Sequence, residues 1–196
     1  MLQRLGFNDE AEFRAFNLPI TQRWIMMQKV AIIGSCGAGK STLAVNLGKK
    51  LNLPVIHLDA YYWQSGWQET DAQKWLQIQQ ELIKGNSWII DGNYSNTLEI
   101  RLAAADTVIW LDFNCYLCLW RVCQRYLKYP GKTRPDMAAN CPERLNRDFI
   151  QYVWNFPRIH RSKIIDKLAK YQHKQIIILQ NPHQALDLLE GFNSEP

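Results

Sequence analysis

The sequence lacks the features that mark membrane-spanning, secreted and repeat proteins. None of its apolar runs approaches the roughly 20 residues that a helix needs to cross a bilayer. Its N-terminal residues do not form a secretory signal, because acidic side chains interrupt them at positions 9, 10 and 12. It contains no internal repeat and no low-complexity linker. We therefore expect the 196 residues to form mainly one globular domain, in the cytoplasm and not in a membrane.

The sequence contains only five cysteines, an odd number that cannot all pair within one chain. Five cysteines in a chain that resembles an intracellular enzyme favour reduced thiols over disulfides. Cys115, Cys118 and Cys123 have a spacing that suggests a metal site, but no histidine lies near them and they belong to a helical pattern with Leu119 and Leu127. We expect them to be small core residues and not zinc ligands.

The strongest motif is GSCGAGKS at residues 34–41, which matches G-x-x-x-x-G-K-S, the P-loop. Its glycines let backbone N–H groups approach phosphate oxygens, and the helix that begins near Lys40 points its positive end at the same anion. Lys40 would neutralise the β- and γ-phosphates, and Ser41 would supply a hydroxyl to Mg²⁺. We expect ATP and Mg²⁺ as ligands. The predicted nucleotide-binding residues of this loop are Gly34, Ser35, Cys36, Gly37, Ala38, Gly39, Lys40, Ser41 and Thr42.

Short apolar runs alternate with amphipathic helical patterns along the chain. The runs are uniformly apolar, which is typical of parallel strands buried on both faces. Their alternation with helices predicts a doubly wound α/β domain over residues 29–196, preceded by an extension over 1–28. Translation starting at Met26 or Met27 would remove most of that extension. The expected strands are 29–34, 55–58, 88–90, 107–112 and 175–179.

Three of these strands are followed by an aspartate. Ligands of such sheets bind beyond the carboxyl ends of the strands. Asp91 is the candidate Mg²⁺ residue, acting through a water molecule, because Gly92 lets the backbone pass close to phosphate. Asp112 is the alternative, although it can equally belong to the cap of the next helix together with Asn114. Asp59 is the candidate general base for the acceptor hydroxyl, with a loop-capping aspartate as the other interpretation.

Two further helices are expected around these residues. One follows the aromatic cluster at 61–67 and begins at a capping box of Thr70 and Gln73. It belongs to an acceptor-side segment, 60–86, in which the aromatic rings either stack on a ligand or pack beneath the helix. The other helix is expected to begin at Cys141.

Positive charge is concentrated in residues 114–174, which hold 13 Lys and Arg against 4 Asp and Glu. Such a surface attracts anions. We expect residues 114–160 to form a helical lid whose arginines Arg121, Arg125 and Arg134 bind phosphate oxygens during transfer. Solvated helix faces are the alternative interpretation for part of these cations.

Five stretches together resemble one family. The P-loop, DAYYWQSGWQ, WIIDGNY, Arg121-x-x-x-Arg125 and RPDMAANCPERL resemble the bacterial P-loop proteins known as DNA topology modulation proteins, over roughly residues 29–192. These are similar in layout to adenylate kinase and shikimate kinase. The resemblance implies a three-layer fold with a five-stranded sheet in the order 2-3-1-4-5 and a helical lid.

The resemblance also implies roles for single residues. Arg121 and Arg125 would be the arginines at the lid base, one near adenine and one on phosphate, and Asp59 would match the acceptor-binding aspartate of shikimate kinase. The chain departs from adenylate kinase after Asp91-Gly92, where Asn93-Tyr94-Ser95 stands in place of Pro-Arg. The arginine that binds a nucleoside monophosphate is therefore missing there unless Arg101 substitutes for it.

Three functions fit these observations. The leading hypothesis is a kinase that transfers the ATP γ-phosphate to a nucleotide or another small hydroxyl-bearing acceptor. The second is an ATP-binding regulator that acts on DNA, for which the basic segment speaks, although the chain has no helix-turn-helix, zinc or basic-tail signature. The third is a slow NTPase with a structural role.

Overall fold

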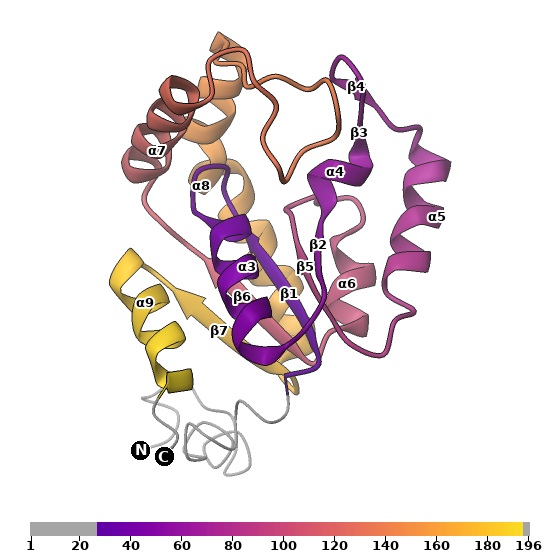
Figure 1. The fold of residues 1–196 in the computed structure, drawn as a ribbon. Coiled ribbons are helices and arrows are strands. Elements are labelled where there is room, and N and C mark those ends of the chain that lie inside the picture. The colour runs from indigo at the N-terminus through magenta and orange to yellow at the C-terminus, as the bar shows by residue number, and fades with distance from the viewer. Residues whose placement is uncertain (1–26, 194–196) are drawn as a thin grey trace.

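A five-stranded parallel sheet lies between two layers of helices in the computed structural model, which describes residues 27–193 (Figure 1). The predictions made for residues 1–26 lie outside the described residues. The sheet has the order β2-β5-β1-β6-β7, which is 2-3-1-4-5 when its own strands are counted along the chain. The predicted α/β fold is confirmed. The strands are β1 (Lys29–Gly34), β2 (Val55–His57), β5 (Trp88–Asp91), β6 (Thr107–Leu111) and β7 (Gln175–Leu179).

The central strands are buried on both faces, as their uniform apolar composition predicts. Along β1, Val30 and Ile32 pack into one core cluster, and Ala31 and Ile33 pack into the other. No helix among the described residues is long and apolar enough to span a bilayer. The first cluster contains α3 (Lys40–Leu51), α7 (Cys115–Lys128) and α9 (Pro182–Glu190), and the second contains α5 (Ala72–Leu82), α6 (Leu98–Ala104) and much of α8 (Arg147–Leu168).

Short elements connect β2 to α5. They are the helix α4 (Leu58–Tyr62) and a hairpin of β3 (Trp63–Gln64) and β4 (Gln68–Glu69). Two 3-10 turns, η2 (Ala169–Tyr171) and η3 (Gly191–Asn193), end the helices α8 and α9. The hairpin lies at the edge of the molecule, above the carboxyl end of β2 (Figure 1).

The two helix starts predicted at Thr70 and at Cys141 are both wrong. The N-cap of α5 is Asp71, whose Oδ1 accepts from the backbone amides of Gln73 and Lys74. The Thr70 hydroxyl instead donates to the Tyr62 carbonyl oxygen (2.6 Å) and closes the hairpin. At α8 the Asn146 Oδ1 accepts from the Phe149 amide (2.8 Å). The helix therefore begins at Arg147 and not at Cys141.

Residues 129–146, here called the lid loop, connect α7 to α8. A β-bridge pairs Thr133 with Pro142 within the loop. On either side of it, α7 and α8 place Val122 and Val153 in the core with no exposed surface. Of the predicted lid, 114–160, the helical parts are thus packed on the sheet, and the lid loop is the part that extends over the carboxyl edge.

The three cysteines of α7 do not share one environment. Cys118 is buried in the core, as predicted, whereas Cys115 is half-buried and Cys123 is exposed. The expectation of a core position is therefore wrong for Cys123, because it lies on the outer face of an amphipathic helix.

Candidate active site

The P-loop connects β1 to α3, and its lysine donates a hydrogen bond back to the backbone at the start of the loop. The ammonium of Lys40 donates to the Ser35 carbonyl oxygen (3.0 Å). At Gly37, where φ is +80°, a Cβ atom would lie 2.3 Å from the carbonyl oxygen of Cys118 in α7. Only glycine fits this approach. The predicted nucleotide-binding residues 34–42 therefore run from the end of β1 through a loop, 35–39, that lies against α7, into the positive N-terminus of α3.

Ser41, Asp91 and His57 meet at the carboxyl edge of the sheet. The Ser41 hydroxyl donates to Asp91 Oδ2 (2.7 Å), and His57 Nδ1 lies 2.7 Å from Asp91 Oδ1. Since a carboxylate only accepts, Nδ1 carries the proton in this contact. The hydrogen bond to Asp91 raises the pKa of His57 against the opposing effect of burial. The hydroxyl and carboxylate oxygens of Ser41 and Asp91 are the donor types that Mg²⁺ prefers.

Gly92 is required by the packing of the fold, whereas its predicted approach to phosphate stays a prediction. Its φ is +143°, and a Cβ atom there would lie 2.9 Å from the side chain of Leu58. Glycine at this position lets the first turn of α4 pack on the end of β5. The residue that Gly92 approaches closely is therefore Leu58 of the neighbouring helix α4.

Asp59 lies in α4 and not at the end of the strand, because β2 stops at His57. The Tyr94 hydroxyl donates to Asp59 Oδ1 (2.6 Å). Burial first, and then Asp59, raise the pKa of Tyr94, so its hydroxyl stays protonated and remains a donor. The Tyr94 ring packs against Tyr62 (4.5 Å between centroids) and Trp75 (4.8 Å). Of the predicted aromatic cluster, 61–67, Tyr62 therefore packs against Trp75 of α5, the second of the two predicted arrangements.

Arg101 does not reach the position of a phosphate-binding arginine. Its side chain has no exposed surface, and burial lowers its pKa to about 9, which still leaves it charged at neutral pH. Its Nη1 donates to Gln79 Oε1 (2.6 Å), and its Nη2 donates to the carbonyl oxygens of Gly92 (3.3 Å) and Tyr94 (3.4 Å). Arg101 thus braces the segment after β5 from the inside.

The lid arginines lie on the P-loop side. Arg121 Nη1 donates to the Ala38 carbonyl oxygen (3.0 Å). Arg125 and Arg134 share the carboxylate of Glu143: Arg125 Nη2 is 2.7 Å from Oε1, and Arg134 Nε is 2.8 Å from Oε2. Arg134 Nη1 also donates to Asp136 Oδ2 (2.8 Å). The side chain of Glu143 is 3% exposed, so it binds the two guanidinium groups almost out of solvent.

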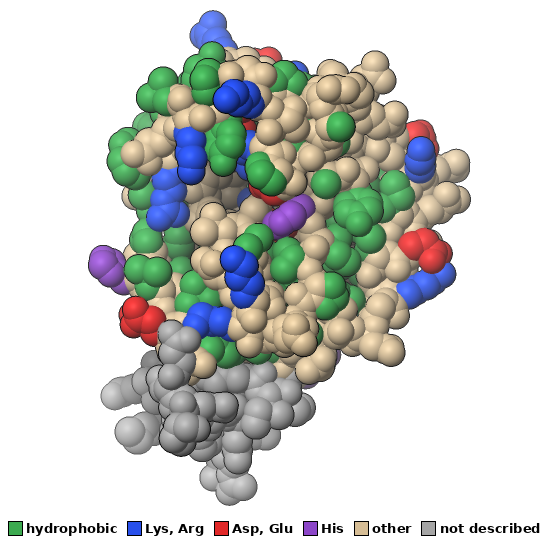
Figure 2. Space-filling view, in the orientation of Figure 1, with side chains coloured by type: hydrophobic (Ala, Val, Ile, Leu, Met, Phe, Trp, Pro, Cys, Tyr) green, Lys and Arg blue, Asp and Glu red, His purple; other side chains and the backbone are tan. Residues whose placement is uncertain are grey.

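These arginines face the P-loop thiol. Burial raises the pKa of Cys36, and the positive charges that oppose this effect are those of Lys40, Arg125 and Arg134. Of the predicted catalytic residues, Lys40, Asp59, Arg125 and Arg134 act electrostatically on Cys36, and Arg121 contacts Ala38 of the same loop. Figure 2 shows this face of the molecule hollowed between the lid loop with α7 above and α3 below, with Lys and Arg side chains along the rim.

The lid loop reaches across the cleft to the hairpin. The Gly66 amide donates to the Asn140 carbonyl oxygen (3.1 Å), and the Trp67 indole N–H donates to that of Pro142 (3.0 Å). Arg144 lies over the Trp67 ring at 4.3 Å from its centroid. The phosphate-binding and acceptor-side segments thus meet in a roof over the carboxyl edge of the sheet.

Asp112, the alternative metal residue, forms an ion pair with a residue of α8. Its Oδ2 accepts from Arg161 Nε of α8 (2.8 Å), and the neighbouring Asn114 caps α7 by accepting from the Tyr116 amide (2.8 Å). A shallow hollow of about 370 Å³ lies beside this pair, away from the phosphate cradle. The geometry favours the helix-cap interpretation of this region.

Two residues of this site were missed by the sequence interpretation. His57 is a polar residue in an otherwise apolar strand, and its register partner in β5 is Asp91, so the sheet order and register together would have found it. Glu143 was interpreted as the start of a helix. Nothing local in the sequence shows that two arginines, 18 and 9 residues before it, pair with it.

Comparison with known proteins supports the fold. No family model and no curated protein matches the chain. A shikimate kinase from Acinetobacter baumannii in complex with shikimate has a TM-score of 0.55 at 15% identity, over 88% of this chain and 93% of that chain. A sugar kinase from Janibacter sp. HTCC2649 has a TM-score of 0.47 at 18% identity, over 84% and 91%. A deoxyadenosine kinase from M. mycoides with bound dATP has 0.44 at 13%, over 85% and 99%.

The first of these structures shares its α/β fold with this chain. The resemblance to the DNA topology modulation proteins stays a prediction.

Proposed function

We propose that this protein is an ATP-dependent kinase that phosphorylates a hydroxyl group of a small acceptor. The observation that carries the proposal is the meeting of three features at the carboxyl edge of adjacent strands. The P-loop follows β1, the Ser41–Asp91 pair joins α3 to the end of β5, and Asp59 follows β2. They supply a phosphate cradle, a metal-binding pair and a carboxylate for the acceptor.

Each group has a defined task in the transfer. Lys40 and the lid arginines bind the phosphate oxygens and stabilise the charge that develops on them. Bound Mg²⁺, held by Ser41 and by Asp91 through water, would neutralise the phosphates. Asp59 accepts the hydroxyl proton as the acceptor oxygen bonds to the γ-phosphorus and the bond from that phosphorus to ADP breaks. The roof of hairpin and lid loop excludes water, which would otherwise compete as acceptor.

The basic segment supports this proposal better than a DNA-acting role. Of its 13 cations, seven form a hydrogen bond or an ion pair with another group of the described residues. Lys167 and Lys174, for example, donate to backbone carbonyl oxygens of Ser95 and Leu102. Cations used in this way neutralise few DNA phosphates. A steep loss of DNA affinity with salt would favour the regulator instead.

The first test is binding of ATP–Mg²⁺ by calorimetry, followed by acceptor-dependent release of ADP. We expect Lys40→Ala to abolish binding or turnover, because it removes the cation of the phosphate cradle. Lys49→Ala, at the exposed end of the same helix α3, is the matched control and should behave as wild type. Equal ATP affinity in wild type and a folded Lys40→Ala protein would contradict the proposal.

A further inference from the structure

Helix α7 has apolar side chains on two opposite sides. Its inner side buries Cys118 and Val122 in the core. Its outer side carries four residues, here called the outer stripe: Tyr116, Trp120, Cys123 and Leu127. Tyr116 is 65% exposed, Trp120 58% and Leu127 76%. Figure 1 shows α7 at the outer edge of the molecule, and Figure 2 shows hydrophobic side chains gathered over it.

The outer stripe has the spacing of a helix–helix seam. Its members follow one another at intervals of four, three and four residues, which is the a and d pattern of a helix that packs along a second helix. On an α-helix these positions fall within a sector of about 60°, opposite to Cys118 and Val122. A helix that is apolar on both sides is normally buried on both sides. The outer stripe of α7 is exposed.

Helix α8 widens the apolar patch. The Trp154 ring meets the Tyr116 ring edge-on, with 5.2 Å between the centroids, and Trp154 is 48% exposed. Ile150, one turn earlier in α8, is 38% exposed. At about 200 Å² for a large side chain, the exposed parts of these two residues and of Tyr116, Trp120 and Leu127 amount to roughly 600 Å². A standard interface buries about 800 Å² on each partner, so the patch supplies most of one.

The outer stripe complements itself about a two-fold axis. When the axis passes between Trp120 and Cys123, the Tyr116 side chain of one copy lies against Leu127 of the other, and Trp120 lies against Cys123. Each member of the stripe then meets an apolar partner, and both copies use the same surface, as an isologous contact requires. The two α7 helices run antiparallel in this arrangement.

The charges of α7 favour the same direction. The helix carries three cations and no acidic residue. Arg121 contacts Ala38 and Arg125 pairs with Glu143, on the side of the cleft. The third cation is Lys128, beside the outer stripe at the C-terminal end of the helix. Parallel pairing would set Lys128 against its own copy, whereas antiparallel pairing separates the two by roughly 20 Å along the helix axis.

We infer that this protein forms a two-fold symmetric dimer in which α7 of each copy packs antiparallel against α7 of the other along the outer stripe. The stripe lies opposite to the side of α7 from which Arg121 reaches the P-loop, so both clefts stay open in the dimer. The inference does not depend on the proposed kinase function.

Sedimentation equilibrium of the full chain over a series of concentrations tests it. We expect a monomer–dimer equilibrium with a dissociation constant on the order of 10 μM, as suits an interface of modest area. Trp120→Glu should raise this constant about 100-fold, because it places an unpaired charge at the centre of the interface. Leu76→Glu, at an exposed leucine of α5, is the matched control and should leave the constant unchanged. Thermal melts check that both variants are folded.

Cys123 tests the pairing of the two helices. It is the exposed one among the five cysteines, and its two copies flank the axis. A short bismaleimide should therefore join two wild-type chains and should fail to join two Cys123→Ser chains.

Three outcomes overturn the inference. A wild-type chain that stays monomeric at about 100 μM has no such dimer. If that monomer sediments with vesicles of anionic lipid, the outer stripe belongs to a membrane surface instead. A dimer that Trp120→Glu leaves intact, or that the reagent joins equally well without Cys123, is formed by another surface.

Discussion

The phosphate side and the acceptor side of the cleft handle charge in opposite ways. On the phosphate side, two arginines of α7 and the lid loop are paired with the buried carboxylate of Glu143. On the acceptor side, residues 58–104, the buried Arg101 donates hydrogen bonds to amide and backbone oxygens. Asp59 accepts from the Tyr94 hydroxyl and forms no ion pair among the described residues. The arginines of the phosphate side are partly exposed at the edge of the cleft, where phosphate oxygens could compete with Glu143 for them. Arg101 lies inside the protein, where a ligand cannot reach it.

The sharpest test of this contrast is a pair of substitutions, one on each side. Asp59→Asn should leave ATP binding nearly intact and lower acceptor-dependent turnover on the order of 10²–10⁴-fold, because it removes the proposed general base. Asp91→Asn should instead raise the Mg²⁺ concentration needed for half-maximal turnover, because it weakens the pair that Ser41 forms with this carboxylate. Magnesium titrations of both variants at saturating ATP measure the difference.

The two variants should therefore differ in kind. If Asp59→Asn shifts the Mg²⁺ requirement while Asp91→Asn does not, the two carboxylates are assigned the wrong way round. If neither changes turnover, the kinase proposal loses its catalytic centre.

A second test removes the carboxylate that holds the lid arginines. Glu143→Gln leaves Arg125 and Arg134 without their shared counter-ion, and breaking a buried pair in this way costs on the order of 3 kcal/mol of unfolding free energy. ATP brings phosphate oxygens that replace the lost carboxylate, so the shift of the melting temperature on adding ATP should be larger than in wild type.

Glu99→Gln is the matched control for this test. It breaks the exposed pair with Lys170, which solvent screens, so it should change the unfolding free energy little and leave the response to ATP unchanged. Equal losses of stability in the two variants would show that Glu143 has no special place on the phosphate side.

A third test asks whether the roof between the two sides responds to ligand. The contacts of Gly66 and Trp67 with the lid loop are few and lie at the surface, so this region should open locally more easily than the sheet. A non-hydrolysable ATP analogue should slow amide hydrogen exchange in residues 129–146 about tenfold, because the arginines that flank the loop then bind phosphate. Lys40→Ala should show no slowing. Unchanged exchange in wild type at saturation would contradict a closing lid.

The two sides also differ in how far the sequence predicts them. The phosphate side is largely predictable, since the P-loop is a contiguous motif and Ser41 meets Asp91 wherever parallel strands carry them to one edge. On the acceptor side, Asp59 was assigned to a strand end because its apolar neighbours suggest β structure. Leu58 instead packs on Gly92 and begins a helix, which requires knowledge of a residue 34 positions away.

Arginine shows most clearly why composition alone misleads. Arg101, Arg125 and Arg134 look alike in the sequence, yet one is internal and two are paired on the edge of the cleft. The difference depends on which oxygen atoms the fold brings near each guanidinium. Those oxygens come from Gln79, Gly92 and Glu143, and no local pattern connects them to their arginines.

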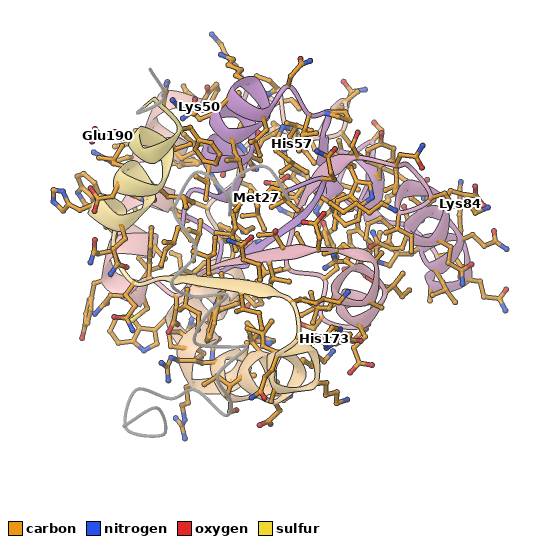
Figure 3. All side chains as sticks on the ribbon, turned by 90° about the horizontal axis from the view of Figure 1, so that it is seen from below. Met27, Lys50, His57, Lys84, His173 and Glu190 are labelled. Atoms are coloured by element: carbon orange, nitrogen blue, oxygen red, sulfur yellow. The ribbon has the colours of Figure 1, made fainter. Side chains whose placement is uncertain are left out.

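The smallest effect concerns His57, the last residue of the edge strand β2 (Figure 3). Its pKa is raised in the folded protein by the hydrogen bond to Asp91. The charged pair therefore stabilises the fold fully below the unfolded value of 6.5, and the contribution is lost as pH rises through the higher folded value. His57→Asn keeps a donor at this place and removes the charge. In EDTA, without nucleotide, it should lower the unfolding free energy by on the order of 1 kcal/mol near pH 6 and by less near pH 8.5. Thermal melts across this pH range measure the difference, a few degrees at most. In an Asp91→Asn background the pH dependence of the difference should disappear, because the partner charge is gone. A difference that grows toward high pH would mean that His57 is neutral in the folded protein, and the pair would then be held by an uncharged hydrogen bond.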